Sequence, residues 1–458
     1  MRRVQILLLI LLPASLMWLS CGSGSSSKNN SLAYRAFITN TVSSGSLAAG
    51  TVVVNAESDD RTSTSISSGN TPGMMVVTPN RALTLVFSGS GTQSSDNQFS
   101  ILDNTKEDGA NRLYLTGTTE SFVVSPDSST AYIAVPTAPV VGQSPGIVEA
   151  VTLSTGTAIG QVEIPAVHYL SISNNGSRVL GFSDNSNSVA VITPSNIGIL
   201  NAQTVTSVGG FDHPVAAFFS PDDTTAYVLN CGAECGGTQA SIQTLNLTNN
   251  TAGTSGVVCT LGGNPPCAGT LNLPAGSVAL VDGSTIYVAG TPVPASSCTG
   301  QTTAATTCGL LNVVNLNTLS VTNTASIVIT DGYHNRIALG PNGQLFIGAR
   351  TCTEISSATE TRGCLSIYNT LATKVGSAQP GGVVIPPANG DVTGLQPIAK
   401  RSTSIKRVAQ EVVYVVQGGS VYIYDTTIDA LAYNPHNTNN PGQIYGLVGN
   451  FVDVKTVD

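Results

Sequence analysis

The stretch SFVVSPDSSTAYIAV, residues 121–135, decides the fold, together with the run IVEAVTL at residues 147–153. Two apolar runs meet at Ser125-Pro126-Asp127, and the third run alternates apolar and polar residues. Proline sets φ at the second position of a β-turn, and an aspartate side chain hydrogen-bonds to the turn backbone. The stretch therefore predicts a small antiparallel meander of three strands.

The same unit recurs along the chain. Each copy has an apolar run, a turn anchor, a second run centred on a bulky residue and a third, alternating run. The spacing of the anchors is 47 or 48 residues at first and 59 to 61 residues later, as they lie at Pro79, Pro126, Asn174, Pro221, Asp282 and Pro341. A period of this length is typical of repeat architectures.

Further runs such as Gln161–Ile164 supply a fourth, outer strand to each unit. Four antiparallel strands per unit predict an all-β protein built as a β-propeller, in which each unit forms one blade. The count gives eight blades, or seven if one loop-rich unit has been divided wrongly. We expect the innermost strand of each blade to be buried on both faces, because its apolar run is continuous.

The two ends of the chain indicate how the ring closes. The first unit begins at a second strand, Ala36–Asn40, with no first strand before it. The last unit has residues 444–448 as its expected outer strand, and one more strand, Phe451–Lys455, is left over. We expect this C-terminal strand to pair with the N-terminal blade, which removes the open edge.

Several short motifs make the units resemble those of the YVTN-repeat, or YncE-like, β-propeller family. Phe37-Ile38-Thr39-Asn40 stands where that family has Tyr-Val-Thr-Asn, and Tyr227-Val228-Leu229-Asn230 is close to it. Ser125-Pro126-Asp127 and Ser220-Pro221-Asp222 resemble the family's Ser-Pro-Asp-Gly turn, whereas most other blades depart from the signature. The resemblance covers residues 33–458. It implies the propeller fold but not one function, since such propellers include ligand-binding, surface and scaffolding proteins and sugar lactonases.

The N-terminus has the form of an export signal. Arg2 and Arg3 precede an apolar run, Val4–Leu19, that ends at Ser20-Cys21-Gly22. A basic start, a short apolar run and a small residue at the cut are typical of secretory signals. The place of Cys21 resembles the lipidated cysteine of a bacterial lipoprotein. We therefore expect a signal peptide over residues 1–20, a flexible tether over residues 21–32 and the propeller over residues 33–458.

Composition narrows the location and the partners. Gly22 is not the aspartate that commonly retains lipoproteins at the inner membrane, so we expect an outer-membrane lipoprotein, periplasmic or surface-exposed. Charged residues make up only 10% of the chain and the net charge is -8, which disfavours nucleic-acid binding. The expected partners are the membrane, through the lipid anchor, and a protein, peptide or glycan ligand. We expect a monomer.

Eight further cysteines lie in the longer units that follow Pro221. An even number of cysteines in an exported chain favours disulfides. Pairing neighbours in sequence would close one loop each: Cys231 with Cys235, Cys259 with Cys267, Cys298 with Cys308, and Cys352 with Cys364. A zinc site at Cys231 and Cys235 is the alternative. It is disfavoured because no second cysteine or histidine pair lies at metal-ligand spacing.

Three histidines, His168, His213 and His334, lie just before predicted first strands, which begin around one mouth of a propeller's channel. These are the candidates for a catalytic or metal site. Their positions relative to the turn anchors differ by one or two residues, so we expect ordinary rim or loop histidines, no metal and no cofactor. Four carboxylates near the same strand starts are expected to be solvated turn residues: Glu120, Asp212, Asp331 and Asp391.

Large aromatic residues recur in the second strands, at Tyr132, Tyr227, Tyr287, Phe346 and Tyr414. We expect them to pack between blades rather than to stack on sugars, because stacked blades need bulky β-formers at equivalent sites. The sequence has neither a His-Glu-x-x-His zinc motif nor a phosphate-binding Gly-Lys-Ser/Thr loop. The leading interpretation is a binding or scaffold protein. The alternative is an exported lactonase-like hydrolase with its site at the channel mouth.

Overall fold

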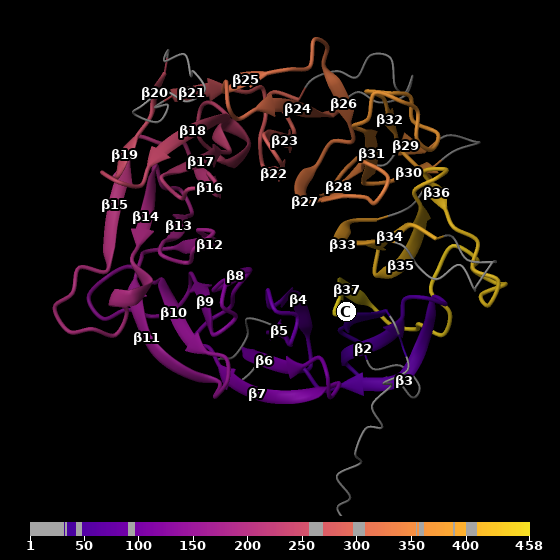
Figure 1. The fold of residues 1–458 in the computed structure, drawn as a ribbon, viewed down its shortest axis with the longest axis horizontal. Coiled ribbons are helices and arrows are strands. Elements are labelled where there is room, and N and C mark those ends of the chain that lie inside the picture. Colours follow the sequence, from indigo (N-terminus) through magenta and orange to yellow (C-terminus); the bar gives the residue numbers. More distant parts are fainter. Residues whose placement is uncertain are drawn as a thin grey trace, which may run out of the picture.

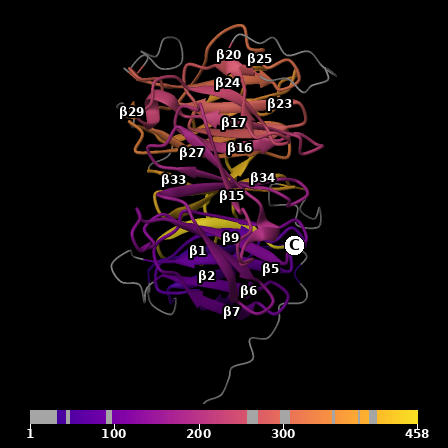
Figure 2. The same ribbon diagram turned by 90° about the vertical axis from the view of Figure 1, so that its left-hand side faces the viewer.

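The computed structural model describes residues 32, 34–42, 48–89, 97–255, 269–295, 307–353, 355–356, 361–387, 390–399 and 410–458. Over these ranges the chain forms eight blades that stand in a ring around a central axis (Figure 1). Seen edge-on, the ring is a single layer of blades (Figure 2). The prediction of an eight-bladed, all-β propeller is confirmed. In the described ranges no helix is long and apolar enough to cross a membrane.

The first four blades follow each other along the chain. Blade 1 combines β1 (Arg35–Asn40), β2 (Gly50–Asn55) and β3 (Asp60–Ile66) with β37 (Phe451–Thr456). Blade 2 has β4 (Pro72–Val77), β5 (Leu83–Ser88), β6 (Gln98–Asp103) and β7 (Asp108–Tyr114), and blade 3 has β8 (Ser121–Val124), β9 (Thr130–Val135), β10 (Ile147–Thr152) and β11 (Thr157–Glu163). Blade 4 has β12 (Val167–Ile172), β13 (Val179–Ser183), β14 (Ser188–Ile192) and β15 (Val205–Gly209). The short 3-10 helix η2 (Pro194–Asn196) lies between β14 and β15.

The later blades carry additional short elements. Blade 5 has β16 (Pro214–Phe219), β17 (Thr225–Asn230), β18 (Ser241–Asn246) and β21 (Gly269–Asn272), with η3 (Gly232–Cys235), β19 (Thr251–Ala252) and β20 (Thr254–Ser255). Blade 6 has β22 (Val278–Asp282), β23 (Thr285–Gly290), β24 (Gly309–Asn315), β25 (Ser320–Val321) and β26 (Ile327–Ile329). Blade 7 has β27 (Tyr333–Leu339), β28 (Gln344–Arg350), β31 (Leu365–Asn369) and β32 (Val383–Val384), with the hairpin β29 (Ile355–Ser356) and β30 (Thr361–Arg362). Blade 8 has β33 (Val392–Ile398), β34 (Val412–Gln417), β35 (Ser420–Asp425) and β36 (Ala430–Leu431).

The second strand of a blade is more buried than the innermost strand. All six residues of β34 are buried, whereas most residues of β4, β12 and β16 are only half-buried. The expectation that the innermost strand is buried on both faces was therefore wrong. The reason is that the innermost strands of the ring border the central channel, while each second strand is covered by the neighbouring blades on both faces.

The aromatic residues of the second strands pack between blades, as predicted. Tyr132, Tyr287, Phe346 and Tyr414 are all buried and belong to apolar clusters that join adjacent blades. The Phe346 ring of blade 7 lies edge-on to the Tyr424 ring of blade 8, with centroids 6.3 Å apart. These contacts leave the four buried aromatics unavailable for stacking on a sugar, and the partly buried Tyr227 packs against the apolar cluster between blades 5 and 6.

The C-terminal strand closes the ring, as predicted. β37 pairs antiparallel with β1, so that Val454 lies opposite Ile38. The buried carboxylate of Asp453 accepts hydrogen bonds from the backbone N–H of Met75, at 2.8 Å, and from the Lys455 ammonium, at 3.1 Å. The last strand of the chain is thus bonded to blade 1 and also to the start of blade 2.

The predicted outer strand of blade 8 was wrong. The outer strand is β36, Ala430–Leu431, whereas within residues 444–448 only Tyr445 forms a bridge, to Asp60. A tight turn after β35, in which the Asp429 N–H donates to the Asp425 carbonyl, returns the chain directly to the edge of that strand. The later segment instead passes from blade 8 to blade 1, where the Tyr445 N–H donates to the Asp59 carbonyl.

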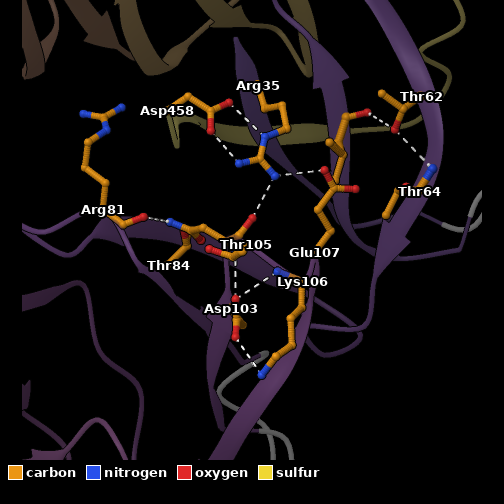
Figure 3. A network of polar contacts seen from close by, with 12 residues as sticks. Arg35, Thr62, Thr64, Arg81, Thr84, Asp103, Thr105, Lys106, Glu107 and Asp458 are labelled. Carbon is orange, nitrogen blue, oxygen red and sulfur yellow. Dashed lines mark hydrogen bonds and ion pairs between the residues drawn. The ribbon is translucent and has the colours of Figure 1, made fainter. Parts of the chain in front are cut away.

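A half-buried arginine reinforces the closure (Figure 3). Arg35 of β1 donates from Nη1 to Glu107 Oε1 of blade 2, at 3.0 Å, and from Nε to Asp458 Oδ2, at 2.8 Å. Its hydrogen bond to Asp458 is the main cause that raises the pKa of the guanidinium. The Glu107 side chain is only 1% exposed, so Arg35 is the basic partner of a buried carboxylate.

We predict that Arg35→Ala lowers the free energy of unfolding by about 3 kcal/mol, because it leaves the buried Glu107 carboxylate without its partner. Denaturant unfolding followed by circular dichroism measures the loss. Lys106→Ala is the control, since Lys106 is 76% exposed and forms a surface pair with Asp103; it should cost less than about 1 kcal/mol. Equal effects of the two substitutions would contradict the role given to Arg35.

Candidate functional site

One face of the ring collects the features that the sequence singled out. Strand direction alternates within a blade, so the starts of the innermost strands and the connections between second and third strands lie on the same side. We call this side the mouth face. It carries the β17–β18 and β28–β31 connections, which contain the disulfides Cys231–Cys235 and Cys352–Cys364.

Two predicted disulfides are confirmed, with Cα atoms 5.6 Å apart in each. Cys308 is also disulfide-bonded. Cys298, the predicted partner of Cys308, lies outside the described residues, and so do both members of the predicted pair Cys259 and Cys267. The expected lipidation site, Cys21, lies outside them too. The disulfide leaves no thiolate at Cys231 or Cys235 for zinc, and the described part of the chain has no group of three or more side chains arranged to hold a metal ion.

Two cavities lie at the mouth face. The first, of about 540 Å³, is bordered by innermost strands of several blades and is called here the channel cavity; its wall includes Glu120, Val278, Arg336 and Arg350. The second, of about 360 Å³, is called here the side cavity; its wall includes His168, Asp184, His213 and Glu234. Tyr169, Val215 and Tyr333 border both.

Two of the residues that border both cavities are tyrosines in contact with each other. The Tyr169 hydroxyl of β12, in blade 4, lies 3.1 Å from the Tyr333 hydroxyl of β27, in blade 7. Blades 5 and 6 stand between these strands in the ring, so the pair spans part of the mouth (Figure 1). Burial, followed by the neighbouring phenol of Tyr333, raises the pKa of Tyr169 far above its usual value. The Tyr169 phenol therefore remains neutral and can donate or accept a hydrogen bond.

His168 is held between two carboxylates. Its Nδ1 lies 2.8 Å from Asp184 Oδ1, its Nε2 lies 3.4 Å from Glu120 Oε2, and its ring stacks on Tyr169 with centroids 4.2 Å apart. The hydrogen bond to Glu120 is the main cause that raises the pKa of His168, and the same contact lowers the pKa of Glu120. The arrangement favours a charged imidazolium with both nitrogens occupied, which suits neither a general base nor a metal ligand.

His213 shares the side cavity with His168, but His334 does not. His213 Nδ1 lies 3.3 Å from Asp212 Oδ1. His334 is completely buried, and its Nε2 donates to the Thr330 carbonyl at 2.9 Å. The structure thus brings two of the three candidate histidines to one cavity and leaves the third inside blade 7.

A β-bulge explains why His334 is separate. The pairing of β12 shifts between Val167 and Tyr169, which makes His168 the bulged residue, whereas the pairing of β27 shifts between His334 and Arg336. His334 therefore occupies the place of the fully buried Val167, and Asn335 the place of His168. A one-residue difference in strand position moves a side chain to the opposite face.

Glu234 is a site residue that the sequence reasoning missed. It lies within η3, between Cys231 and Cys235, and its Oε2 accepts a 3.0 Å hydrogen bond from the Thr291 N–H of blade 6. Burial raises its pKa to about 7. A carboxyl group with this pKa exchanges protons readily near neutral pH. Its place among the three residues between Cys231 and Cys235 was the one available signal.

The carboxylates near the strand starts anchor the disulfide loops instead of facing solvent alone. Asp212 accepts backbone hydrogen bonds from Thr238 and Gln239, which close the loop of Cys231–Cys235. The Thr353 N–H donates to Asp331 and the Thr351 N–H to Asp391, both at 2.8 Å, beside Cys352. These aspartates therefore hold the walls of the mouth in place.

We predict a pH dependence of stability that comes from His334. Burial lowers its pKa to about 4 from an ordinary value of 6.5, so the unfolded chain binds a proton before the folded chain does. The stability contribution of the neutral ring is present above pH 6.5 and is lost as the pH falls toward 4, by roughly 3 kcal/mol. His334→Gln should lose correspondingly less stability between pH 7 and pH 4 in denaturant unfolding. Parallel losses in both proteins would contradict this prediction.

Comparison with known proteins places the chain by fold. No family model matches it, and no curated protein matches its sequence. The solved structure of the dihydro-haem d1 dehydrogenase NirN in complex with DHE aligns with 93% of this chain and 75% of its own, at a TM-score of 0.56 and 9% identity. A functionally unknown protein from Desulfotomaculum acetoxidans aligns with 77% of this chain and 98% of its own, at a TM-score of 0.47 and 17% identity. At such identities the likeness to NirN shows a shared β-propeller fold and nothing further.

Proposed function

We propose that this protein is an exported, lipid-anchored β-propeller of the YVTN-repeat family that binds a protein, peptide or glycan ligand at its mouth face. The observation that carries the proposal is the pair of adjoining cavities at this face, of about 540 and 360 Å³. Concave sites with apolar walls and a few fixed polar groups are typical of ligand binding. The channel cavity has this character, since Met74, Phe87 and Val278 line it together with Asn335 and Arg336.

The surrounding loops support recognition of a ligand. The β17–β18 and β28–β31 connections are closed by disulfides and anchored by Asp212, Asp331 and Asp391. They rise on one side of the mouth only, because blades 2 to 4 have no disulfide in these connections. Loops fixed on a rigid scaffold are common binding surfaces.

The histidine geometry favours binding over hydrolysis. Both ring nitrogens of His168 face carboxylates. Among the described residues, no hydroxyl or thiol group is hydrogen-bonded to the ring of His168 or His213. A nucleophile activated by histidine needs that contact. Hydrolysis of lactones is therefore the second candidate function of the mouth face.

The lipid anchor rests on the N-terminal sequence, in which Cys21 follows an apolar run at the end of a signal-like segment. We predict that the wild-type protein, expressed in a Gram-negative bacterium, incorporates labelled palmitate and fractionates with the outer membrane. Cys21→Ser should abolish the label and release the protein from the membrane fraction, because no acyl chain is attached. Membrane association of the unlabelled Cys21→Ser protein would contradict the anchor.

A pair of glycine substitutions tests binding in the channel. A Cβ added at Gly73, which borders the channel cavity, has only the Phe87 carbonyl oxygen within 4 Å, at 3.6 Å, and a Cβ at Gly109 of the outer strand β7 has no neighbour within 4 Å. We predict that ligands found by a thermal-shift screen of peptides and oligosaccharides bind wild type and Gly109→Trp alike. Gly73→Trp should weaken them roughly tenfold or more by filling the cavity.

Isothermal titration calorimetry on the three proteins provides the affinities. Equal affinities for Gly73→Trp and Gly109→Trp would contradict binding in the channel. Metal-dependent turnover of a lactone that is lost in His168→Ala would replace binding by hydrolysis.

A further inference from the structure

Two arginines form part of the wall of the channel cavity, although the chain has a net charge of -8. Arg336 lies in β27, and Arg350 ends the neighbouring strand β28. Arg336 is paired with Gly348 in the sheet, so the two arginines are two residues apart in register on one blade. One wall of the channel therefore presents two guanidinium groups.

Arg336 is held in place by backbone carbonyls. Its Nε donates to Thr393 O of blade 8, at 2.7 Å, and its Nη1 donates to Asn335 O, at 2.9 Å. Gly348 allows close packing at this point, since a Cβ there would lie 2.4 Å from Val392 Cγ1 and 3.3 Å from the Arg336 Cβ. Within the described ranges, Arg336 forms no ion pair with an acidic side chain. A fixed guanidinium without an acidic partner is prepared to bind an anion.

Arg350 is only weakly paired. Its Nε lies 4.0 Å from Asp391 Oδ2, and the other Asp391 oxygen accepts the 2.8 Å hydrogen bond from the Thr351 N–H. Its side chain is 49% exposed. An ion pair of this length and exposure contributes little energy, so a ligand anion competes with Asp391 at small cost.

Glu120 is the carboxylate on the channel-cavity wall, and it already has a partner. His168 Nε2 lies 3.4 Å from Glu120 Oε2. The hydrogen bond to His168 chiefly lowers the pKa of Glu120, and the charges of Arg350 and Arg336 lower it further. Both guanidiniums thus act on the interior of the cavity. The wall of the channel cavity thus has two arginines and one glutamate, which is an excess of one positive charge.

We propose that the channel cavity binds the carboxylate group of its ligand through Arg336 and Arg350. The inference deepens the proposed binding function and rests on it. The carboxylate accepts hydrogen bonds from the guanidinium groups, while the ligand's apolar part lies against Met74, Phe87 and Val278. A peptide with a free C-terminus and a uronic-acid sugar share this chemistry, and a cavity of about 540 Å³ is in the range of small-ligand sites.

Two matched pairs of probes test the proposal by isothermal titration calorimetry. One pair is N-acetyl-Ala-Phe and its C-terminal amide, and the other is methyl glucuronide and methyl glucoside. We expect wild type to bind the acid of one pair roughly tenfold or more tightly than its neutral counterpart, as a charge-assisted hydrogen bond implies. The pair that shows the difference identifies the peptide or the sugar as the source of the carboxylate.

Substitutions assign the effect to the arginines. Arg336→Gln and Arg350→Gln should each remove most of the preference for the acid, and Arg336→Lys should keep part of it, because the charge remains while the planar fork is lost. Arg178→Gln is the matched control, since Arg178 lies in the β12–β13 turn on the opposite face and donates to Ser177 O. Arg350→Gln also serves if Arg336→Gln fails to fold, because the Arg350 side chain is half-exposed.

Two outcomes would overturn the carboxylate site. One is equal binding, or no binding, of acid and neutral probe by wild type; the other is a preference for the acid that survives in both glutamine variants. The binding function is judged separately by the Gly73→Trp and Gly109→Trp comparison. Neutral ligands that Gly73→Trp excludes would preserve that function even when the acid preference is absent.

Discussion

The closure of the ring by β37 is the constraint on which the rest of the structure depends. Without this strand, β1 would be an open edge, and unpaired strand edges invite association with other chains. The antiparallel pairing of β37 with β1 satisfies that edge, and Asp453 and Arg35 extend the bond to blade 2. Each blade buries its apolar faces against two neighbours only when the circle is complete. The channel and both cavities exist because the first and last segments of the chain meet.

The ring also sets the character of the channel. Its innermost strands are left half-exposed, as the burial of β4, β12 and β16 shows. Bulges at the starts of β12, β16 and β27 then change which side chains face the opening, among them His168, Val215 and Asn335. Bulges commonly re-aim side chains near functional sites. The mouth is therefore shaped by local irregularities on a regular frame, and the Tyr169–Tyr333 contact lies at the border of its two cavities.

The fold was predictable because its signals are local and repeated. In the turn after β8, the Ser129 N–H donates to Asp127 Oδ1 and the Thr130 N–H donates to Ser125 Oγ, so neighbouring residues determine the turn. The site was largely not predictable, because it joins residues such as Tyr169 and Tyr333 that are 164 positions apart. No period in the sequence relates them. The histidines differ in their distance from the turn anchors, but only the bulges of β12 and β27 explain why His168 borders a cavity and His334 is buried.

The charge at the mouth depends on which carboxylates already have hydrogen-bond partners within the protein. The sequence positions of four acidic residues near strand starts would make this face acidic: Glu120, Asp212, Asp331 and Asp391. The three aspartates instead accept backbone hydrogen bonds from the disulfide-closed loops, and Glu120 contacts His168. A carboxylate that accepts a hydrogen bond from a backbone N–H or an imidazolium contributes less negative potential to the channel. The loops that build the rim thereby hold these three aspartates at the rim, and Arg336 and Arg350 are the two basic residues on the wall of the channel cavity.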